Sequence, residues 1–313
     1  MAVAYTDTCV NYIGDLFQLG QTDTPFLNMI GGLNGGVRVV NSTEFAMSQY
    51  WQLGTAAQPA ISEADSMTAP TATTITRNQA TNVVQIFQEQ VSVSYSKLGN
   101  ANAISGVALT GETQPVRNEL DFQIEAHMKK IAKNANYTFL HGAYAAVTNN
   151  TTAVKTRGVV TAITTNAIAQ TSTPQLTKAM LDELFLKCAD NGMDFANAAL
   201  FVNGYNKQIV SGMYGNYAEQ DRNIGGKNIK QIETDFGNVM VVYEPTMAGT
   251  VALLDMGKIK PVAKDIPGKG QLFYEPLSKV GAGEQGQIYG ELGIDYANEA
   301  FHGKITGLKS SAA

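Results

Sequence analysis

The longest regular pattern of apolar and polar positions runs from Val116 to Leu140. Apolar side chains recur there every three or four residues. This period predicts an amphipathic helix of about seven turns, roughly 38 Å long at about 1.5 Å per residue. Pro115 and Gly142 are expected to delimit it. The apolar side comprises Val116, Leu120, Ile124, Met128, Ile131, Ala135 and Phe139, and the polar side comprises Arg117, Asp121, Glu125, Lys129, Lys133 and Asn136.

Two segments before this helix alternate with a period of two, which predicts half-buried strands at residues 43–53 and 83–95. Between them, residues 56–81 are poor in large apolar side chains and rich in Thr, Ala, Ser and Pro, so they cannot build a core of their own. We therefore expect a long hairpin that projects from the body. The alternating apolar positions are Phe45, Met47, Trp51 and Leu53 in the first strand and Val91, Val93 and Tyr95 in the second.

The remaining segments complete an α+β chain. Near the N-terminus, Thr24 and Pro25 favour a short capped helix that ends at Gly31. The later pattern predicts a helix over residues 174–191 that ends at Gly192. After it we expect a buried strand over residues 198–202 and a short helix over 205–213. Further strands are expected at 238–243 and 250–255, and strands alternate with turns in the last 55 residues.

The composition favours a subunit of an assembly. Only 16% of the 313 residues are charged and 44% are hydrophobic, and a weakly charged surface is easier to bury against another subunit. The net charge of −5 and the scattered basic residues do not suit a protein that grips nucleic acid. The densest basic group, Lys129, Lys130 and Lys133, is interpreted as the solvated side of a helix. No apolar run is long enough to span a membrane.

The residues that commonly carry chemistry are not arranged for it. His127, His141 and His302 lack metal-ligand spacing, and Cys188 falls on the apolar side of its predicted helix. The spaced glycines of 281–286 lead into alternating positions, which favours a strand over a dinucleotide-binding loop. Cys9 and Cys188 are predicted to stay reduced and unpaired in a reducing cytoplasm, since no signal peptide precedes them. We predict no catalytic residue, cofactor or metal.

The order of these elements resembles that of the tailed-bacteriophage major capsid protein family, whose phage capsid fold is shared with encapsulins. Individual runs are similar as well. The run QTDTPFLNMIGG resembles an arm motif of that family, and RNQATNVVQIFQEQVSVSYS resembles the strand that returns from its E-loop hairpin. NELDFQIEAHMKKIAKNANYTFLHG resembles its long spine helix. RGVVTAI and VVYEPTMAGTVALLD resemble the entry to its axial (A) domain and the later strands of that domain.

The resemblance implies a division of the chain into five segments: an N-terminal arm (1–42), an E-loop hairpin with its base (43–98), a peripheral (P) domain with the spine helix (99–165), an A-domain (166–256) and a β-rich return completing both domains (257–313). It also implies a structural subunit that assembles with itself, as pentamers and hexamers, into an icosahedral or prolate capsid. Its expected intersubunit contacts are Pro25, Phe26, Ile61, Met67, Ile75 and Arg77.

The same resemblance implies a virion protein made in the cytoplasm of a bacterial host. The capsid would enclose DNA without sequence-specific binding, with scaffolding, portal and decoration proteins as further partners and no membrane. Because the arm motif lies within 30 residues of Met1, we expect a separate scaffolding protein or none. Three alternatives stay open: an encapsulin-like nanocompartment shell protein, another phage structural protein such as a tail tube, and an enzyme of unknown type.

Overall fold

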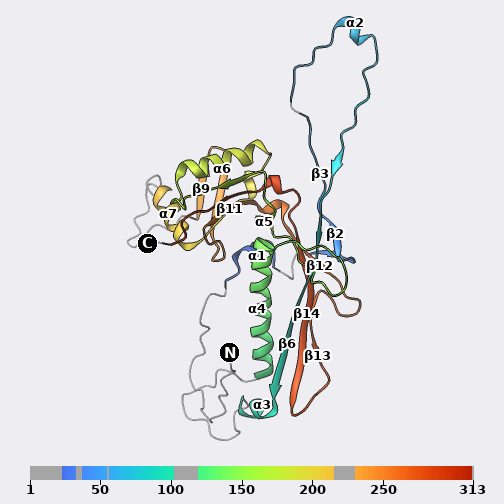
Figure 1. Cartoon of the computed structure of the whole chain (residues 1–313), viewed down its shortest axis with the longest axis vertical. Coiled ribbons are helices and arrows are strands. Elements are labelled where there is room, and N and C mark those ends of the chain that lie inside the picture. Colours follow the sequence, from blue (N-terminus) through green and yellow to red (C-terminus); the bar gives the residue numbers. More distant parts are fainter. Residues whose placement is uncertain (1–22, 33–36, 55, 102–118, 215–229, 312–313) are drawn as a thin grey trace.

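The computed structural model describes residues 23–32, 37–54, 56–101, 119–214 and 230–311. Figure 1 shows a body with a long helix beside long strands, a second helix-and-sheet region next to the upper end of that helix, and a thin hairpin that projects away from both. The helices are α1 (Pro25–Met29), α2 (Glu63–Ser66), α3 (Tyr95–Ala101), α4 (Glu119–His141), α5 (Val159–Ala162), α6 (Lys178–Asp190) and α7 (Gly204–Tyr214), with short 3-10 turns η1 (Phe195–Asn197), η2 (Met256–Lys258) and η3 (Glu299–Phe301).

The strands form two larger sheets and two short pairs. The strands are β1 (Arg38–Val40), β2 (Glu44–Ala46), β3 (Tyr50–Trp51), β4 (Arg77–Asn78), β5 (Thr81–Val83), β6 (Gln85–Ser94), β7 (Ala167–Ala169), β8 (Ala198–Val202), β9 (Gln231–Thr234), β10 (Gly237–Tyr243), β11 (Thr250–Asp255), β12 (Lys260–Lys264), β13 (Leu272–Pro276), β14 (Gly283–Asp295) and β15 (Gly303–Thr306). The α+β class predicted from the sequence is confirmed.

Helix α4 forms the long axis of the body and ends at His141, as its pattern predicted. The predicted start at Val116 lies outside the described residues. Its C-terminal half is the buried part, with Ile131 and Phe139 fully enclosed, whereas Ile124 is half-buried and Met128 is exposed. Asn136 was predicted on the polar side and is buried instead, because the short helix α1 packs there and the Leu27 N–H donates to Asn136 Oδ1 at 2.9 Å.

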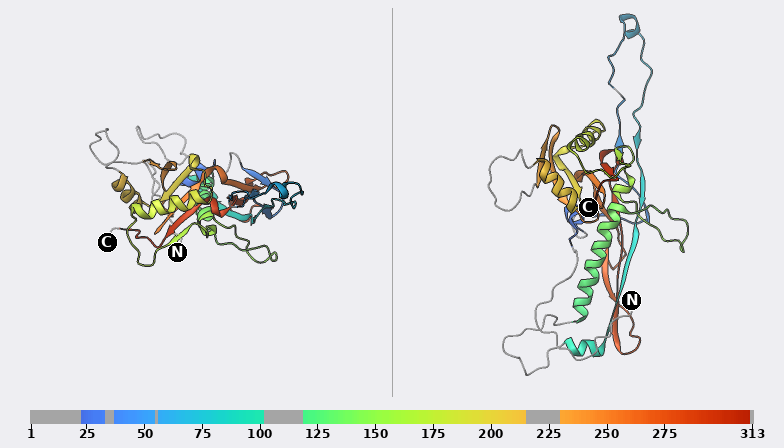
Figure 2. Two further views of the ribbon diagram at one scale, coloured as in Figure 1. Left: turned by 90° about the horizontal axis from the view of Figure 1, so that it is seen from above. Right: turned by 60° about the vertical axis from the view of Figure 1, so that its left-hand side comes forward.

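A five-stranded sheet lies along α4, as Figures 1 and 2 show from two directions. Its order is β1-β12-β14-β13, and β6 pairs with the other edge of β14 from Gly283↔Ser94 to Leu292↔Gln85. Val91 and Val93 of β6 are buried while Ser92 is exposed, which confirms the predicted alternation. Tyr95 departs from it, because the chain turns into α3 at that residue and the ring is left exposed. The glycines at 283 and 286 lie in β14, so the predicted strand is confirmed.

The second sheet has the order β7-β15-β11-β8-β10-β9, and its two middle strands, β11 and β8, are buried on both faces. Alternate residues of β8 enter two different cores: Phe201 packs with α1 and α4, and Leu200 packs with α6. Burial on both faces explains why β8 is a continuous apolar run without polar positions. Cys188 of α6 is fully buried in the second core, as predicted, and this burial raises the pKa of its thiol to about 12.

Two details of the N-terminal part differ from the sequence predictions. The segment 43–53 is two short strands rather than one, and Trp51 and Leu53 are exposed, because the chain leaves the body after Met47. Helix α1 begins at Pro25 as predicted, but the Thr24 side chain forms no capping hydrogen bond. Gly31 ends this helix with φ of 94°, a conformation that glycine adopts without steric cost.

Candidate assembly surfaces

The hairpin between β3 and β4 is the most exposed part of the chain. Every described residue from Trp51 to Thr81 is exposed, and Figure 2 shows the hairpin clear of the body in a second view. Three large apolar side chains are exposed to solvent there: Ile61 is 70% exposed, Met67 87% and Ile75 61%. Such side chains gain from burial, and none of the described parts of the subunit covers them.

A short helix, α2, organises the tip of this hairpin. Ser62 and Asp65 form a capping box: the Asp65 N–H donates to Ser62 Oγ at 3.1 Å, and the Ser62 N–H donates to Asp65 Oδ2 at 3.3 Å. Hydrogen bonds from the Ser62 side chain and backbone lower the pKa of the Asp65 carboxyl group. The tip is therefore a defined turn with two acidic residues, Glu63 and Asp65, between Ile61 and Met67.

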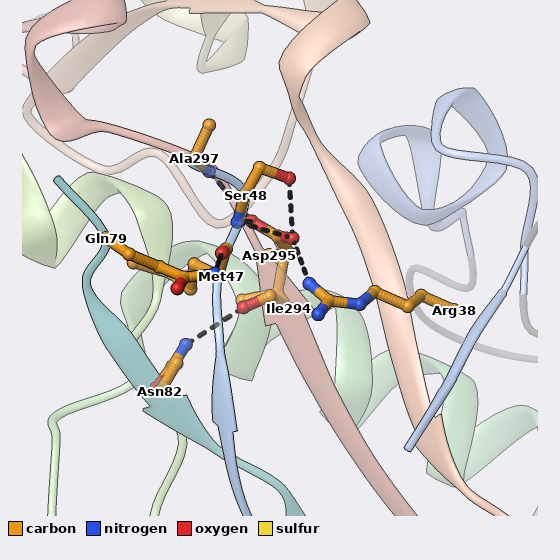
Figure 3. Close-up of polar contacts among 8 residues, drawn as sticks. All are labelled: Arg38, Met47, Ser48, Gln79, Asn82, Ile294, Asp295 and Ala297. Carbon is orange, nitrogen blue, oxygen red and sulfur yellow. Dashed lines mark hydrogen bonds and ion pairs between the residues drawn. The ribbon is translucent and has the colours of Figure 1, made fainter. Parts of the chain in front are cut away.

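The base of the hairpin is fastened to the body by one buried carboxylate, Asp295, at the end of β14. Figure 3 shows its partners converging on it. Arg38 Nη1 donates to Oδ2 at 2.7 Å, the Ser48 hydroxyl donates to Oδ2 at 2.9 Å, and the Ser48 and Ala297 N–H groups also donate. The Asp295 side chain has no exposure, so these bonds replace its hydration.

Two amide side chains complete the base. Asn82 is fully buried; its Nδ2 donates to the Ile294 carbonyl at 2.9 Å and its Oδ1 accepts from the Arg157 N–H at 3.0 Å. Gln79 Nε2 donates to the Met47 carbonyl at 2.6 Å (Figure 3). These bonds join both strands of the hairpin, β14 and the segment after α4. The hairpin therefore leaves the body from a fixed position, although its far part is exposed.

The arm is fastened at a different place. Phe26 is fully buried, and its ring lies edge-on against Phe201 with centroids 5.5 Å apart. Its N–H points at Oε2 of the buried Glu244 at 3.5 Å, and Asn136 Nδ2 donates to Oε1 of the same carboxylate at 3.1 Å. Helix α1 thus joins α4 to the second sheet.

The expected contact residues lie in two separate regions. Ile61, Met67, Ile75 and Arg77 are all exposed on the hairpin, where Arg77 pairs with Trp51 across β3 and β4. Pro25 is half-buried at the start of α1, which Figure 1 shows away from the hairpin, beside the upper end of α4. Phe26 has no exposed surface, because its side chain packs inside its own subunit. Sequence reasoning did not identify the residues that hold the hairpin base, namely Asp295, Arg38 and Asn82. Their partners are far away in the sequence, so no local pattern marks them.

Several lysines of α4 and α6 pair with a carboxylate of the same helix or of β6. Lys129 pairs with Glu125 at 2.7 Å and Lys130 with Glu89 at 2.7 Å, while Lys133 is exposed. Asp182 pairs with Lys178 in the same manner. The exposed positions of Lys129, Lys130 and Lys133 confirm the interpretation of this basic group as the solvated side of a helix.

The three histidines lie apart. His127 contacts Glu89 and His141 lies beside the Tyr137 ring. His302 is completely buried, its Nδ1 accepts from the Asp255 N–H at 3.1 Å, and burial lowers its pKa to about 4. Within the described ranges, no group of three or more His, Cys, Asp or Glu residues could hold a metal ion, and no helix is long and apolar enough to cross a membrane. Cys9 lies outside the described residues.

An open pocket of about 410 Å³ lies beside the hairpin base. Tyr50 and Trp51 of β3 form one wall, Phe301 of η3 forms another, and Lys258 and Lys260 reach its rim from η2 and β12. The Lys258 ammonium group lies 5.8 Å from the centre of the Phe301 ring. The pocket therefore offers aromatic surface together with positive charge.

Comparison with known proteins gives a family and a fold. The family described as SU10 major capsid protein matches residues 2–309. No curated protein sequence matches. Among solved structures, the Cyanophage A-1(L) capsid has 14% identity and a TM-score of 0.61, with 96% of each chain covered.

Two further structures have the same fold at low identity. The capsid of the native GTA particle has 13% identity and a TM-score of 0.61, with 93% of this chain and 92% of that chain covered. The holo-SrpI encapsulin complex from Synechococcus elongatus PCC 7942 has 8% identity and a TM-score of 0.59, with 96% and 94% covered. These identities are too low to show more than the shared fold.

Proposed function

The chain belongs to the SU10 major capsid protein family, and from that premise we propose how its subunits join. It is a structural subunit of a phage capsid, a virion protein that assembles into an oligomeric shell, and not an enzyme. We propose that the exposed hairpin is the E-loop through which each subunit reaches over its neighbour. The single observation that carries this proposal is the exposure of Ile61, Met67 and Ile75 on a hairpin whose base is rigidly held.

The remaining expectations extend this proposal. Symmetric repetition of one contact closes rings, so we propose pentamers and hexamers as the building units of the shell. The net charge of −5 suits a container that encloses DNA without gripping it. Synthesis in the cytoplasm of a bacterial host, and contacts with scaffolding, portal and decoration proteins, belong to the same proposal.

The five-segment division is proposed on the same basis. The two cores support it: one is built around α4 and the five-stranded sheet, and the other lies between α6 and the six-stranded sheet. We propose the boundaries predicted from the sequence, with residues 99–165 as the P-domain and 166–256 as the A-domain. Strand β14 of the return segment lies in the first sheet and β15 in the second, in keeping with a return that completes both domains.

Replacement of residues 59–76 by a short Gly-Ser turn tests the hairpin and leaves β4 and Gln79 at its base in place. Every described residue removed is exposed, so the thermal unfolding of the isolated subunit should stay within a few degrees of the native value. Closed shells counted by electron microscopy should be lost. A matched control is the replacement of the exposed residues 148–152, at another loop, by the same linker.

Each outcome of this comparison has a clear meaning. Normal shells from the hairpin variant would show that the hairpin is not an intersubunit contact. Nucleic acid in purified native particles agrees with a phage capsid, and a protein cargo would instead favour the nanocompartment.

A further inference from the structure

We infer that the hairpin tip of one subunit docks into the pocket at the hairpin base of a second copy of the chain. This inference rests on the proposed role of the hairpin and deepens it by naming both sides of the contact. The donor side is the segment from Ile61 to Met67, called the tip here. The acceptor side is the pocket formed by Tyr50, Trp51, Phe301, Lys258 and Lys260, called the base pocket.

The charges of the two sides are opposite. Between Gly54 and Thr76 the only charged residues are Glu63 and Asp65, so the far part of the hairpin is purely acidic. The base pocket carries two exposed lysines, Lys258 and Lys260, and neither forms a salt bridge within the described part of the chain. Opposite charges steer two copies into a defined orientation.

The apolar surfaces also match. Met67 is 87% exposed and Ile61 70% exposed, and they stand on either side of the acidic turn. In the base pocket, Trp51 is 59% exposed and the Phe301 ring faces the same space. A flexible methionine packs well against aromatic rings through its sulfur. Docking would bury apolar surface on both sides, with the carboxylates placed toward the lysines.

The geometry requires two copies. Figure 1 shows the tip at the far end of the hairpin and β3, which forms a pocket wall, at its base. In this subunit the tip and the base pocket thus lie at opposite ends of the hairpin. A tip therefore fills the pocket of another subunit and not its own. Because donor and acceptor are different surfaces, the contact is head-to-tail and repeats around a ring.

The rigid base makes the contact directional. Ser48, which precedes the pocket wall, is held by Asp295, and Ala297 of the pocket donates its N–H to the same carboxylate. One buried group thus sets both the direction of the hairpin and one side of the pocket. The base therefore holds the start of the hairpin next to the base pocket, so each subunit presents its donor and acceptor sides from one defined place.

Cysteine pairing tests the geometry directly in assembled particles. In the variant Met67→Cys with Phe301→Cys, mild oxidation should give a ladder of covalent multimers on non-reducing gels. The matched control is Met67→Cys with Val147→Cys, since Val147 is also exposed but lies on another loop. Both variants also carry Cys9→Ser, and the remaining native cysteine, Cys188, is fully buried and does not compete. Equal ladders from both variants, or none from the first, would overturn the inference.

Charge exchange tests the energetics. Glu63→Lys and Lys258→Glu each place like charges at the contact, so each should lower the number of particles more than about tenfold, because the loss repeats at every contact of a ring. The two changes together should restore assembly. Melting temperatures of the unassembled subunits should not change, because both side chains are exposed.

The rival acceptor on the subunit is Lys133, an exposed lysine of α4. Rescue of Glu63→Lys by Lys133→Glu, or normal shells from Lys258→Glu, would overturn the docking of the tip in the base pocket. If the native chain itself forms no shells, the proposed function fails; if it forms shells that ignore these exchanges, only the present inference fails.

Discussion

The rings of Phe26 and Phe201 form an edge-to-face contact with centroids 5.5 Å apart, across 175 residues of sequence. This contact joins the N-terminal helix α1 to the central strand of the second sheet. Both rings are fully buried in the core that also contains the C-terminal half of α4. The arm is therefore part of the subunit's own structure at this point, and its removal should affect folding before it affects assembly.

Phe26→Ala is expected to destabilise the subunit by about 3–5 kcal/mol, the usual range for removing a buried phenylalanine side chain. The measurement is urea unfolding of the unassembled chain, followed by its intrinsic fluorescence. Asn28→Ala provides the matched control, because Asn28 lies in the same helix and is exposed. A loss below about 1 kcal/mol for Phe26→Ala would contradict the packing described.

Asp295→Asn should loosen the hairpin base. The substitution keeps the shape of the side chain but removes the charge that strengthens the bonds from Arg38 and Ser48. Charge-assisted bonds of this kind contribute about 1.5–3 kcal/mol each, and we expect a loss of that order in the free energy of unfolding. Limited proteolysis should also cut faster near Gln49.

Asp182→Asn is the control for this change. Asp182 pairs with Lys178 on an exposed helix surface, where such pairs contribute about 0.3–0.5 kcal/mol. If Asp295→Asn cost no more than Asp182→Asn, Asp295 would not anchor the hairpin.

His302 should make stability depend on pH. Burial lowers its pKa to about 4 in the folded chain, against 6.5 for an ordinary histidine. The unfolded chain therefore takes up a proton first as the pH falls. The stability that comes from a neutral His302 is complete above about pH 6.5 and is lost between that pH and about 4, by up to about 3 kcal/mol.

His302→Gln should remove this part of the pH dependence. The free energy of unfolding of both proteins is compared at pH 7 and pH 4.5. The native chain is expected to lose more stability between these values than the variant. Equal losses would assign the pH dependence to other groups.

The sequence predicted regular elements well because their signals are local. The buried run of β8, the alternation of β6 and the end of α4 all follow from periods that neighbouring residues set. Asn136 shows where this reasoning ends. Its position in the helix period is on the polar side. Helix α1, which lies more than 100 residues earlier in the chain, packs against it, so that Asn136 is buried and hydrogen-bonded.

For the hairpin, the sequence predicted the projection but not the residues that hold its base. Its weakly apolar composition predicted a projection, and the structure confirms it. The residues that hold it were not predictable, since Asp295 meets Ser48 over 247 positions and Asn82 meets Ile294 over 212. Period-two alternation also suggested one strand from Thr43 through Leu53, because nothing in the local pattern marks Ser48 as the residue where the chain leaves the body.

The burial of α4 gives the last prediction, a comparison of two isoleucines seven residues apart in one helix. Ile131 is 1% exposed in the first core, whereas Ile124 is only partly buried against it. An unpaired charge in a core costs several kcal/mol, which is comparable to the total stability of about 5–15 kcal/mol of a typical domain. Ile131→Asp should therefore yield no folded subunit. Ile124→Asp should remain folded with a lower melting temperature, since water reaches its carboxylate. The measurement is circular dichroism melting of both purified variants, with Lys133→Asp as an exposed control on the same helix. Equal melting temperatures for the two isoleucine variants would mean that the C-terminal half of α4 is not the buried half.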